Sequence, residues 1–323
     1  MSWVEEITNM SNPAMREAYG KALADYGAIN PEVVVLDADT SSSTLSSYFA
    51  SRFPTRFFNV GIAEPCMIDM SAGLALGGML PFVNAFAALV ALRALEQIRT
   101  CICYNRANVK IAASYAGVSD FKDGPTHHAI TDIAIMRSLP EMTVIVPADA
   151  GEAAAFVKLM AEYDGPAYLR LNRSATQPVS QHGDNLHIGR GIVRRPGSDI
   201  TIIACGSMVG RSLRAADILA GRGVDACVLD MHTVKPLDNN LILKMAGVTG
   251  GVVTAEEHTV IGGLGSAVAE LLAQEMPVTQ ACVGIKDTFA CTGPDPETIM
   301  DAYGLGVRDI ADAALRVMEK KKK

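Results

Sequence analysis

Short apolar segments alternate with longer, alanine- and leucine-rich segments along most of this chain. The short segments are rich in valine, isoleucine and phenylalanine, which is typical of buried strands, and the longer ones are typical of helices. Because the two kinds alternate, the sequence predicts mostly parallel sheets with helices on both faces, an α/β fold. In the first half, the predicted strands are 33–36, 57–60, 82–83, 109–113, 143–146 and 167–171, and the predicted helices are 13–27, 63–76 and 87–104.

The periodicity fades between Ser174 and Arg190 into glutamine, proline, histidine, glycine and aspartate. Such a segment is typical of a domain junction. A second alternation follows it, with predicted strands at 200–204, 225–229 and 251–255 and predicted helices at 209–220 and 264–274. We therefore expect one domain over 1–175, a linker over 176–190 and a smaller α/β domain over 191–323, and a chain of 323 residues has room for two cores.

The run from Met70 to Leu92 contains no charged residue. It is long enough to span a bilayer if it forms one helix. The pair Gly77-Gly78, followed by Pro81 and Asn84, predicts instead a helix, a short strand and a second helix. We therefore expect this run to be buried inside a domain or between subunits, and we expect no association with a membrane.

The bulk composition excludes some classes of partner and of metal site. A formal net charge of −7 argues against a nucleic-acid surface. The seven cysteines form no pairing framework, which suits reduced thiols in a cytoplasmic protein, and the N-terminus shows no basic and then apolar export signal. Cys101 and Cys103 have no histidine or second cysteine pair at ligand spacing, so we predict no metal site on this chain.

The segment 56–65 (RFFNVGIAEP) places Glu64 where a predicted strand is followed by a helix. In an open α/β sheet, that edge is where ligands bind. The uncharged run behind Glu64 predicts a dry environment, which would keep the carboxyl protonated. The alternative interpretation is that Glu64 only complements the positive end of a helix.

Three other segments contain candidate chemistry. An acid and an imidazole lie four residues apart on the loop 123–127 (DGPTH), which suits hydroxyl recognition and proton transfer. Two glycine-rich turns, 205–210 and 262–266, each follow a strand and open a helix, where backbone amides could bind a phosphate. Neither turn fits the dinucleotide fingerprint or the P-loop, so we interpret both as packing features.

Several of these segments, taken in order, resemble the pyrimidine-binding half of a transketolase and then its C-terminal domain. The resemblance covers nearly the whole chain and implies a pyrimidine-binding thiamine diphosphate fold joined to a transketolase C-terminal-like domain. The segments that carry it are 56–64, 82–86, 123–127, 137–140, 147–149, 230–237, 256–258 and 262–266.

The resemblance implies thiamine diphosphate as the cofactor. Glu64 matches the glutamic acid that donates a hydrogen bond to the far nitrogen of the aminopyrimidine ring, and Phe86 matches the aromatic residue that stacks on that ring. Leu89 and Leu92 stand where similar enzymes have two further aromatic residues. His127 matches a histidine that assists near the reacting carbon.

The resemblance also implies a sugar phosphate substrate. Arg16, Ser43 and Arg173 match positions that hold the phosphate, and Asp123 matches a residue that contacts a substrate hydroxyl. Tyr115 replaces a histidine that similar enzymes direct at the substrate. Further departures are the segment 120–122 (DFK) in place of Ile-Gly-Glu, proline at 65 and histidine at 128, so the donor and acceptor sugars, and phosphate versus sulfonate, stay open.

The diphosphate-binding half of this family carries a Gly-Asp-Gly motif that holds a divalent cation, and no such motif occurs here. The segment 182–185 (HGDN) lies in the predicted linker and does not fit. The chain therefore resembles the C-terminal subunit of a split transketolase. We expect a separate diphosphate-binding subunit to supply the Mg²⁺ ligands, in a dimer of heterodimers with the active site between chains, and no turnover by this chain alone.

Three functions follow from these patterns. The first is ketol transfer, in which a two-carbon unit passes from a ketose phosphate to an aldose. The second is a role similar to 1-deoxyxylulose phosphate synthase or to a 2-oxo-acid dehydrogenase beta subunit, which begins with decarboxylation of a 2-oxo acid. The third is a non-catalytic scaffold or regulatory subunit, and the joint presence of Glu64, Phe86, Asp123 and His127 argues against it.

Overall fold

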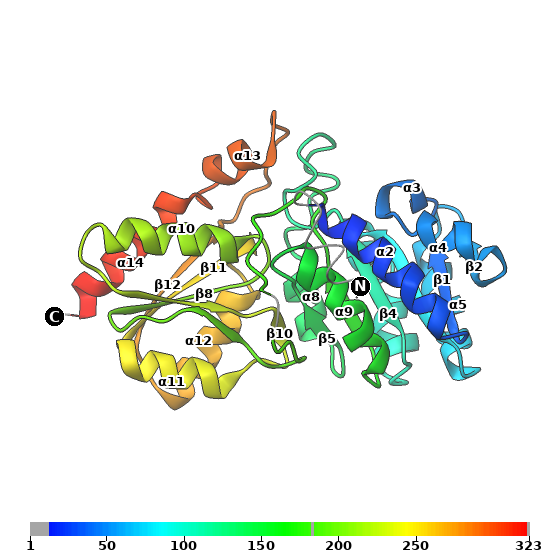
Figure 1. The fold of residues 1–323 in the computed structure, drawn as a ribbon, viewed down its shortest axis with the longest axis horizontal. Helices are drawn as coiled ribbons and strands as arrows, with labels where there is room; N and C mark the ends of the chain where they lie inside the picture. The colour runs from blue at the N-terminus through cyan, green and yellow to red at the C-terminus, as the bar shows by residue number, and fades with distance from the viewer. Residues whose placement is uncertain (1–12, 182–183, 322–323) are drawn as a thin grey trace.

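The computed structural model describes residues 13–181 and 184–321. Residues 1–12 of the first predicted domain, including Asn12 before the first predicted helix, lie outside the described residues, as do 182–183 of the linker and 322–323. The described chain forms two α/β units, each built on one mostly parallel sheet with helices on both sides (Figure 1). The predicted fold class is confirmed.

The first sheet has seven strands in the order β10-β5-β6-β4-β3-β1-β2. All neighbours are parallel except β10, which pairs antiparallel with β5. Strand β10 comes from the second half of the chain, so that half completes the edge of the first sheet. The strands are β1 (Val33–Asp37), β2 (Phe57–Asn59), β3 (Leu80–Phe86), β4 (Lys110–Ser114), β5 (Thr143–Ile145), β6 (Ala167–Arg170) and β10 (Thr233–Lys235).

Helices cover both faces of this sheet because its strands are apolar on both sides. One face packs against α2 (Met15–Ile29), α4 (Ser47–Arg52) and α9 (Ala150–Glu162). The other packs against α5 (Glu64–Leu76), α6 (Ala87–Arg93) and α8 (Asp132–Ser138). The remaining short elements are α3 (Ser41–Thr44), η1 (Pro54–Arg56), α7 (Leu95–Gln97) and η2 (Ile98–Cys103).

The uncharged run forms helix α5, strand β3 and helix α6, as its glycine and proline positions predicted. The single helix predicted over 87–104 is wrong, because the chain there forms α6, α7 and the π-helix η2. Helix α6 ends where Ala94 adopts φ −109° and ψ 16°, in the sparsely populated region between helix and strand. Within residues 13–181 and 184–321, no helix is both long and apolar enough to cross a membrane.

The second sheet has five strands in the order β12-β11-β8-β9-β7, parallel except for β7. Helices α10, α13 and α14 pack on one side of it, and α11 and α12 on the other. The strands are β7 (Ile192–Arg195), β8 (Ile200–Ala204), β9 (Ala226–Asp230), β11 (Gly251–Thr259) and β12 (Thr279–Ile285). The helices are α10 (Met208–Ala220), α11 (Asn239–Thr249), α12 (Leu264–Glu275), α13 (Pro296–Ala302) and α14 (Val307–Lys321).

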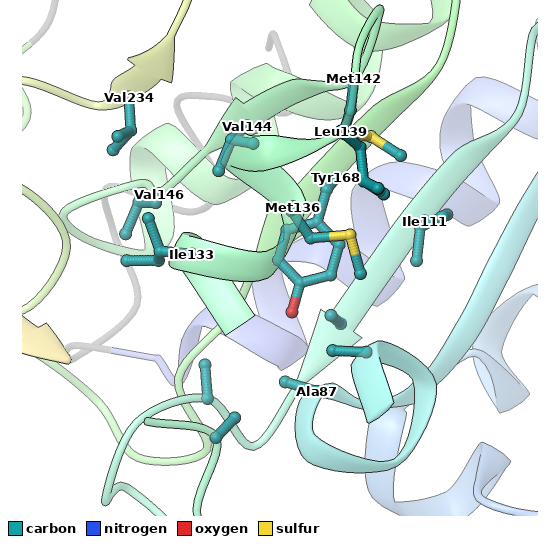
Figure 2. Packing of buried hydrophobic residues seen from close by; sticks show 14 of the residues in the cluster. Ala87, Ile111, Ile133, Met136, Leu139, Met142, Val144, Val146, Tyr168 and Val234 are labelled. Atoms are coloured by element: carbon teal, nitrogen blue, oxygen red, sulfur yellow. The ribbon is translucent and has the colours of Figure 1, made fainter. Parts of the chain in front are cut away.

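The two sheets share one continuous apolar core, which runs from α5, α6 and α8 to α11 and α12. Figure 2 shows Val234 of β10 beside Val144 of β5 and Val146, which follows that strand, with Tyr168 in the centre of the cluster. The hydroxyl of Tyr168 donates to the buried carboxyl of Asp132 at 2.9 Å. This shared core holds the second unit at a fixed position relative to the first sheet.

Candidate functional site

The candidate site residues follow the carboxyl ends of parallel strands in the first sheet. Asp37, the last residue of β1, lies opposite Asn59 of β2 and Asn84 of β3. Phe86, the last residue of β3, lies opposite Ser114 of β4. These strand ends therefore meet at one edge of the sheet, which is where open α/β sheets bind ligands.

Glu64 is the first residue of α5, and its side chain is only 3% exposed. This burial agrees with the predicted dry environment, but the sequence did not predict a charged neighbour. The guanidinium of Arg93, whose side chain is half exposed, donates to Glu64 at 3.1 Å. Because α6 ends at Arg93, the first charge after the uncharged run reaches back to the start of α5.

Phe86 stacks on Tyr115, with ring centroids 4.1 Å apart and planes 22° apart. Phe86 is half-buried, so Tyr115 covers part of its surface and leaves the rest open. His127 approaches the same ring edge-on, at 6.1 Å between centroids. Leu89 is half-buried and Leu92 is 59% exposed in this single chain.

Arg16 contacts three other predicted substrate residues from distant parts of the chain. It donates to the backbone oxygen of Ser43 at 2.6 Å, to that of Arg173 at 3.2 Å and to the hydroxyl of Tyr115 at 3.2 Å. The guanidinium groups of Arg16 and Arg173 lie 5.5 and 5.2 Å from the centroid of the Tyr115 ring. The structure thus brings Arg16, Ser43, Tyr115 and Arg173 together.

The short helix α3, which carries Ser43, is held by the buried carboxyl of Asp37. This carboxyl accepts hydrogen bonds from the Thr40 backbone at 2.5 Å and from the hydroxyls of Thr44 and Ser46, both at 2.9 Å. Burial raises the pKa of Asp37, and the hydrogen bonds from Thr40, Ser46 and Thr44 oppose that rise. The position of Ser43 is therefore fixed by a network behind it.

Asp123 and His127 lie on one tight loop, as the turn-forming residues predicted. Asp123 is exposed and His127 is half-buried. Gly124 has φ +80°, a conformation that favours glycine, and its carbonyl accepts from the backbone N–H of His127 at 2.9 Å. The ring of His127 pairs with the Thr126 hydroxyl at 3.0 Å, so it is oriented within the loop.

Sequence reasoning did not single out Asp120, which lies directly at this cluster. It is fully buried, and its carboxyl accepts from the guanidinium of Arg173 at 3.0 Å. Burial and the neighbouring Asp123 raise the pKa of Asp120 to about 6, while Arg173 and His127 lower it. The available signal was the departure of segment 120–122 from the family pattern, where an acid replaces an apolar residue.

The second domain anchors the loop through Glu257 of β11, whose side chain is buried. Its carboxylate accepts from the Val118 backbone at 2.8 Å, from Asn172 at 2.8 Å and from Ser207 at 2.5 Å. A Cβ on Gly117 would lie 2.2 Å from this carboxylate, so the position requires glycine. Glu257 therefore connects the loop after β4, the end of β6 and the start of α10.

One of the two glycine-rich turns is already filled by an acid. Glu256 accepts hydrogen bonds from the backbone N–H groups of Leu264 and Gly265, both at 2.8 Å, at the start of α12. A carboxylate therefore occupies the place that a phosphate would take. This contact favours the packing interpretation of that turn.

The described residues fit the pyrimidine half of thiamine diphosphate. They provide a buried carboxyl at the sheet edge and a partly open aromatic ring supported from behind by Tyr115. Within 13–181 and 184–321, no group of three or more histidine, cysteine, aspartate or glutamate residues is arranged to hold a metal ion.

Comparison with known proteins gives consistent matches over the whole chain. A model of the transketolase pyrimidine-binding domain matches residues 11–178, and a model of the transketolase C-terminal domain matches residues 189–310. The chain is 41% identical over 312 residues to a putative transketolase C-terminal section from Methanocaldococcus jannaschii, covering 96% of both chains. It is 36% identical to a 1-deoxy-D-xylulose-5-phosphate synthase from Heliobacterium modesticaldum, of which it spans 47%.

A solved structure titled as a split gene transketolase, inactive beta4 tetramer, superposes with a TM-score of 0.88. It is 48% identical in sequence, and the match covers 96% of this chain and 100% of that one. Both family models and these relatives indicate the same family, and the residues at the edge of the first sheet fit it. The resemblance found in the sequence is confirmed: the chain belongs to the transketolase family.

Proposed function

We propose that this chain is the pyrimidine-binding subunit of a two-chain, thiamine diphosphate-dependent transketolase. The complex moves a two-carbon unit from a ketose phosphate to an aldose acceptor. The observation that carries the proposal is the convergence, at one sheet edge, of the buried Glu64, the half-open ring of Phe86 and the cluster of Arg16, Tyr115 and Arg173. Family membership supports it.

Glu64 and Phe86 hold the cofactor ring in this proposal, with Leu89 and Leu92 forming an aliphatic wall. Thiamine diphosphate, when bound, supplies a nucleophilic carbon for breaking and forming carbon–carbon bonds. Glu64 contributes a hydrogen bond to the ring nitrogen farthest from the reaction. Its present partner Arg93 is half exposed, so solvent can take over its interactions when the ring binds.

The substrate lies against the other half of the cluster. Arg16, Ser43 and Arg173 bind the terminal anionic group, because guanidinium forks and a hydroxyl are good anion ligands. Asp123 accepts a hydrogen bond from a substrate hydroxyl. His127, oriented by its loop, transfers a proton near the reacting carbon.

The partner in this proposal is a diphosphate-binding subunit that supplies the Mg²⁺ ligands, in a dimer of heterodimers. Strand β2, helices α5 and α6 and the segment between β2 and α5 present large apolar side chains to solvent, and exposed apolar groups of this kind mark interaction surfaces. The exposed fractions are 37% for Phe58, 74% for Ile62, 39% for Met70, 71% for Leu76 and 59% for Leu92. The seven cysteines are free, which supports a cytoplasmic location.

The test is reconstitution with a subunit that carries the Gly-Asp-Gly motif, thiamine diphosphate and Mg²⁺. Deuterium exchange at the thiazolium carbon is measured for wild type, Glu64→Gln and the exposed control Glu319→Gln, together with two-carbon transfer. We expect Glu64→Gln to slow exchange by about 100-fold and the control to leave it unchanged. Equal exchange by Glu64→Gln would leave only the scaffold role.

A second candidate is a role similar to 1-deoxy-D-xylulose-5-phosphate synthase, because a relative of that name is 36% identical to this chain. That reaction begins with decarboxylation of a 2-oxo acid. Release of carbon dioxide from pyruvate by the reconstituted complex, without transfer from ketose phosphates, would favour it. Ketol transfer stays our first choice because Asp123 and His127 share one loop beside Phe86.

A further inference from the structure

We propose that Asp120 determines which terminal group the substrate carries. By pairing with Arg173, it weakens the preference of the anion subsite for a doubly charged phosphate ester over a singly charged terminal group. This inference rests on the proposed function and deepens it, since it concerns the substrate class of the same site.

The two arginines of the subsite differ in their partners. Arg16 donates only to uncharged oxygens, namely two backbone carbonyls and the Tyr115 hydroxyl, among the contacts of the described residues. Arg173 instead pairs with the carboxyl of Asp120 at 3.0 Å. Both guanidinium groups lie over the ring of Tyr115, so both place a positive charge beside the same ring.

Asp120 is held rigidly at this position. It is fully buried, and its backbone carbonyl pairs with the ring of the buried His128 at 3.0 Å. The hydroxyl of Ser119, its neighbour, accepts from the backbone N–H of Arg173 at 3.0 Å. The carboxyl of Asp120 therefore cannot retreat to solvent when a substrate anion arrives.

The charged groups that act on Asp120 are Arg173, Asp123 and His127. Burial and the neighbouring Asp123 raise the pKa of Asp120 to about 6. The carboxyl of Asp120 is therefore still ionised at pH 8. At that pH, Arg16 and Arg173 contribute two positive charges and Asp120 one negative charge. Asp120 therefore lowers the positive charge of the two arginines from two units to about one.

This balance changes the preference between anions. A phosphate ester carries about two negative charges at this pH, while a sulfate or sulfonate carries one. Each extra charge on the ligand is attracted by the arginines and repelled by the buried carboxylate, whose field is poorly screened. Asp120 therefore reduces the advantage that the second charge of a phosphate gives it over a monoanion.

The experiment compares ribose acceptors that differ only in the group at the 5-position. The reconstituted complex is assayed at pH 8 with hydroxypyruvate as donor and with D-ribose, D-ribose 5-sulfate and D-ribose 5-phosphate as acceptors. For Asp120→Asn, we expect kcat/KM for the phosphate relative to the sulfate to rise by about 10-fold, because the repelling charge is gone. The exposed acid Asp312 on α14 supplies the control Asp312→Asn, which should not change this ratio.

An active Asp120→Asn complex with an unchanged ratio would overturn the inference and leave the proposed function standing. A wild-type complex that transfers no two-carbon unit to any of the three acceptors would instead overturn the proposed function. If the asparagine variant does not fold, Asp120→Ser replaces it, because serine is smaller and its hydroxyl can still accept from Arg173. The same 10-fold rise is expected for that variant, and an unchanged ratio again overturns the inference.

Discussion

Replacing Glu257 with alanine should both destabilise the subunit and release the loop that carries Asp123 and His127. The carboxylate is 2% exposed and accepts three hydrogen bonds, of 2.8, 2.8 and 2.5 Å. Removing it leaves the Val118 N–H and the Asn172 amide buried without this partner. At about 1.5 kcal/mol for each lost hydrogen bond to a charged acceptor, the free energy of unfolding should fall by about 4.5 kcal/mol.

The assay is urea unfolding followed by circular dichroism. The matched controls are Glu257→Gln, which retains one acceptor oxygen and should cost about half as much, and the exposed Glu319→Ala, which should cost less than about 0.5 kcal/mol. In the reconstituted complex, Glu257→Ala should raise KM for both sugars, because the loop then moves. A loss below about 1 kcal/mol, with unchanged KM, would show that Glu257 does not hold this loop and would refute the reasoning.

Three further predictions concern a buried charge, the Glu64 ion pair and a close helix contact. Burial lowers the pKa of Lys110 to about 7, so stability should rise by up to about 1.4 kcal/mol per pH unit from pH 7 towards 10, and Lys110→Met should remove this slope in unfolding titrations. Arg93→Gln should speed thiazolium deuterium exchange by up to about 5-fold, because half-exposed ion pairs contribute up to about 1 kcal/mol, and a slower exchange would contradict an inhibitory contact with Glu64. Gly20→Ala would place a Cβ 2.5 Å from the Leu45 carbonyl and should lower the free energy of unfolding by about 1 to 3 kcal/mol, which thermal melting would detect.

The sequence by itself determined the α/β class and the approximate position of most strands of the first sheet. Periodicity, glycine and proline are local signals, so they also divided the uncharged run into helix, strand and helix correctly. The position of Glu64 at a strand-to-helix transition followed from the same signals. The extended helix over 87–104 was wrong because the bend at Ala94 has no local signal of this kind.

Only the tertiary structure decided which side chains meet. Arg93 lies 29 residues from Glu64, Arg173 lies 53 residues from Asp120, and Glu257 lies 139 residues from Val118. Strand β10 likewise joins a sheet whose other strands all come from residues 33–170. Local periodicity specifies which face of an element is buried. A contact between distant residues depends instead on how whole elements pack against each other. The charged partners of the candidate site residues therefore could not be predicted from the sequence.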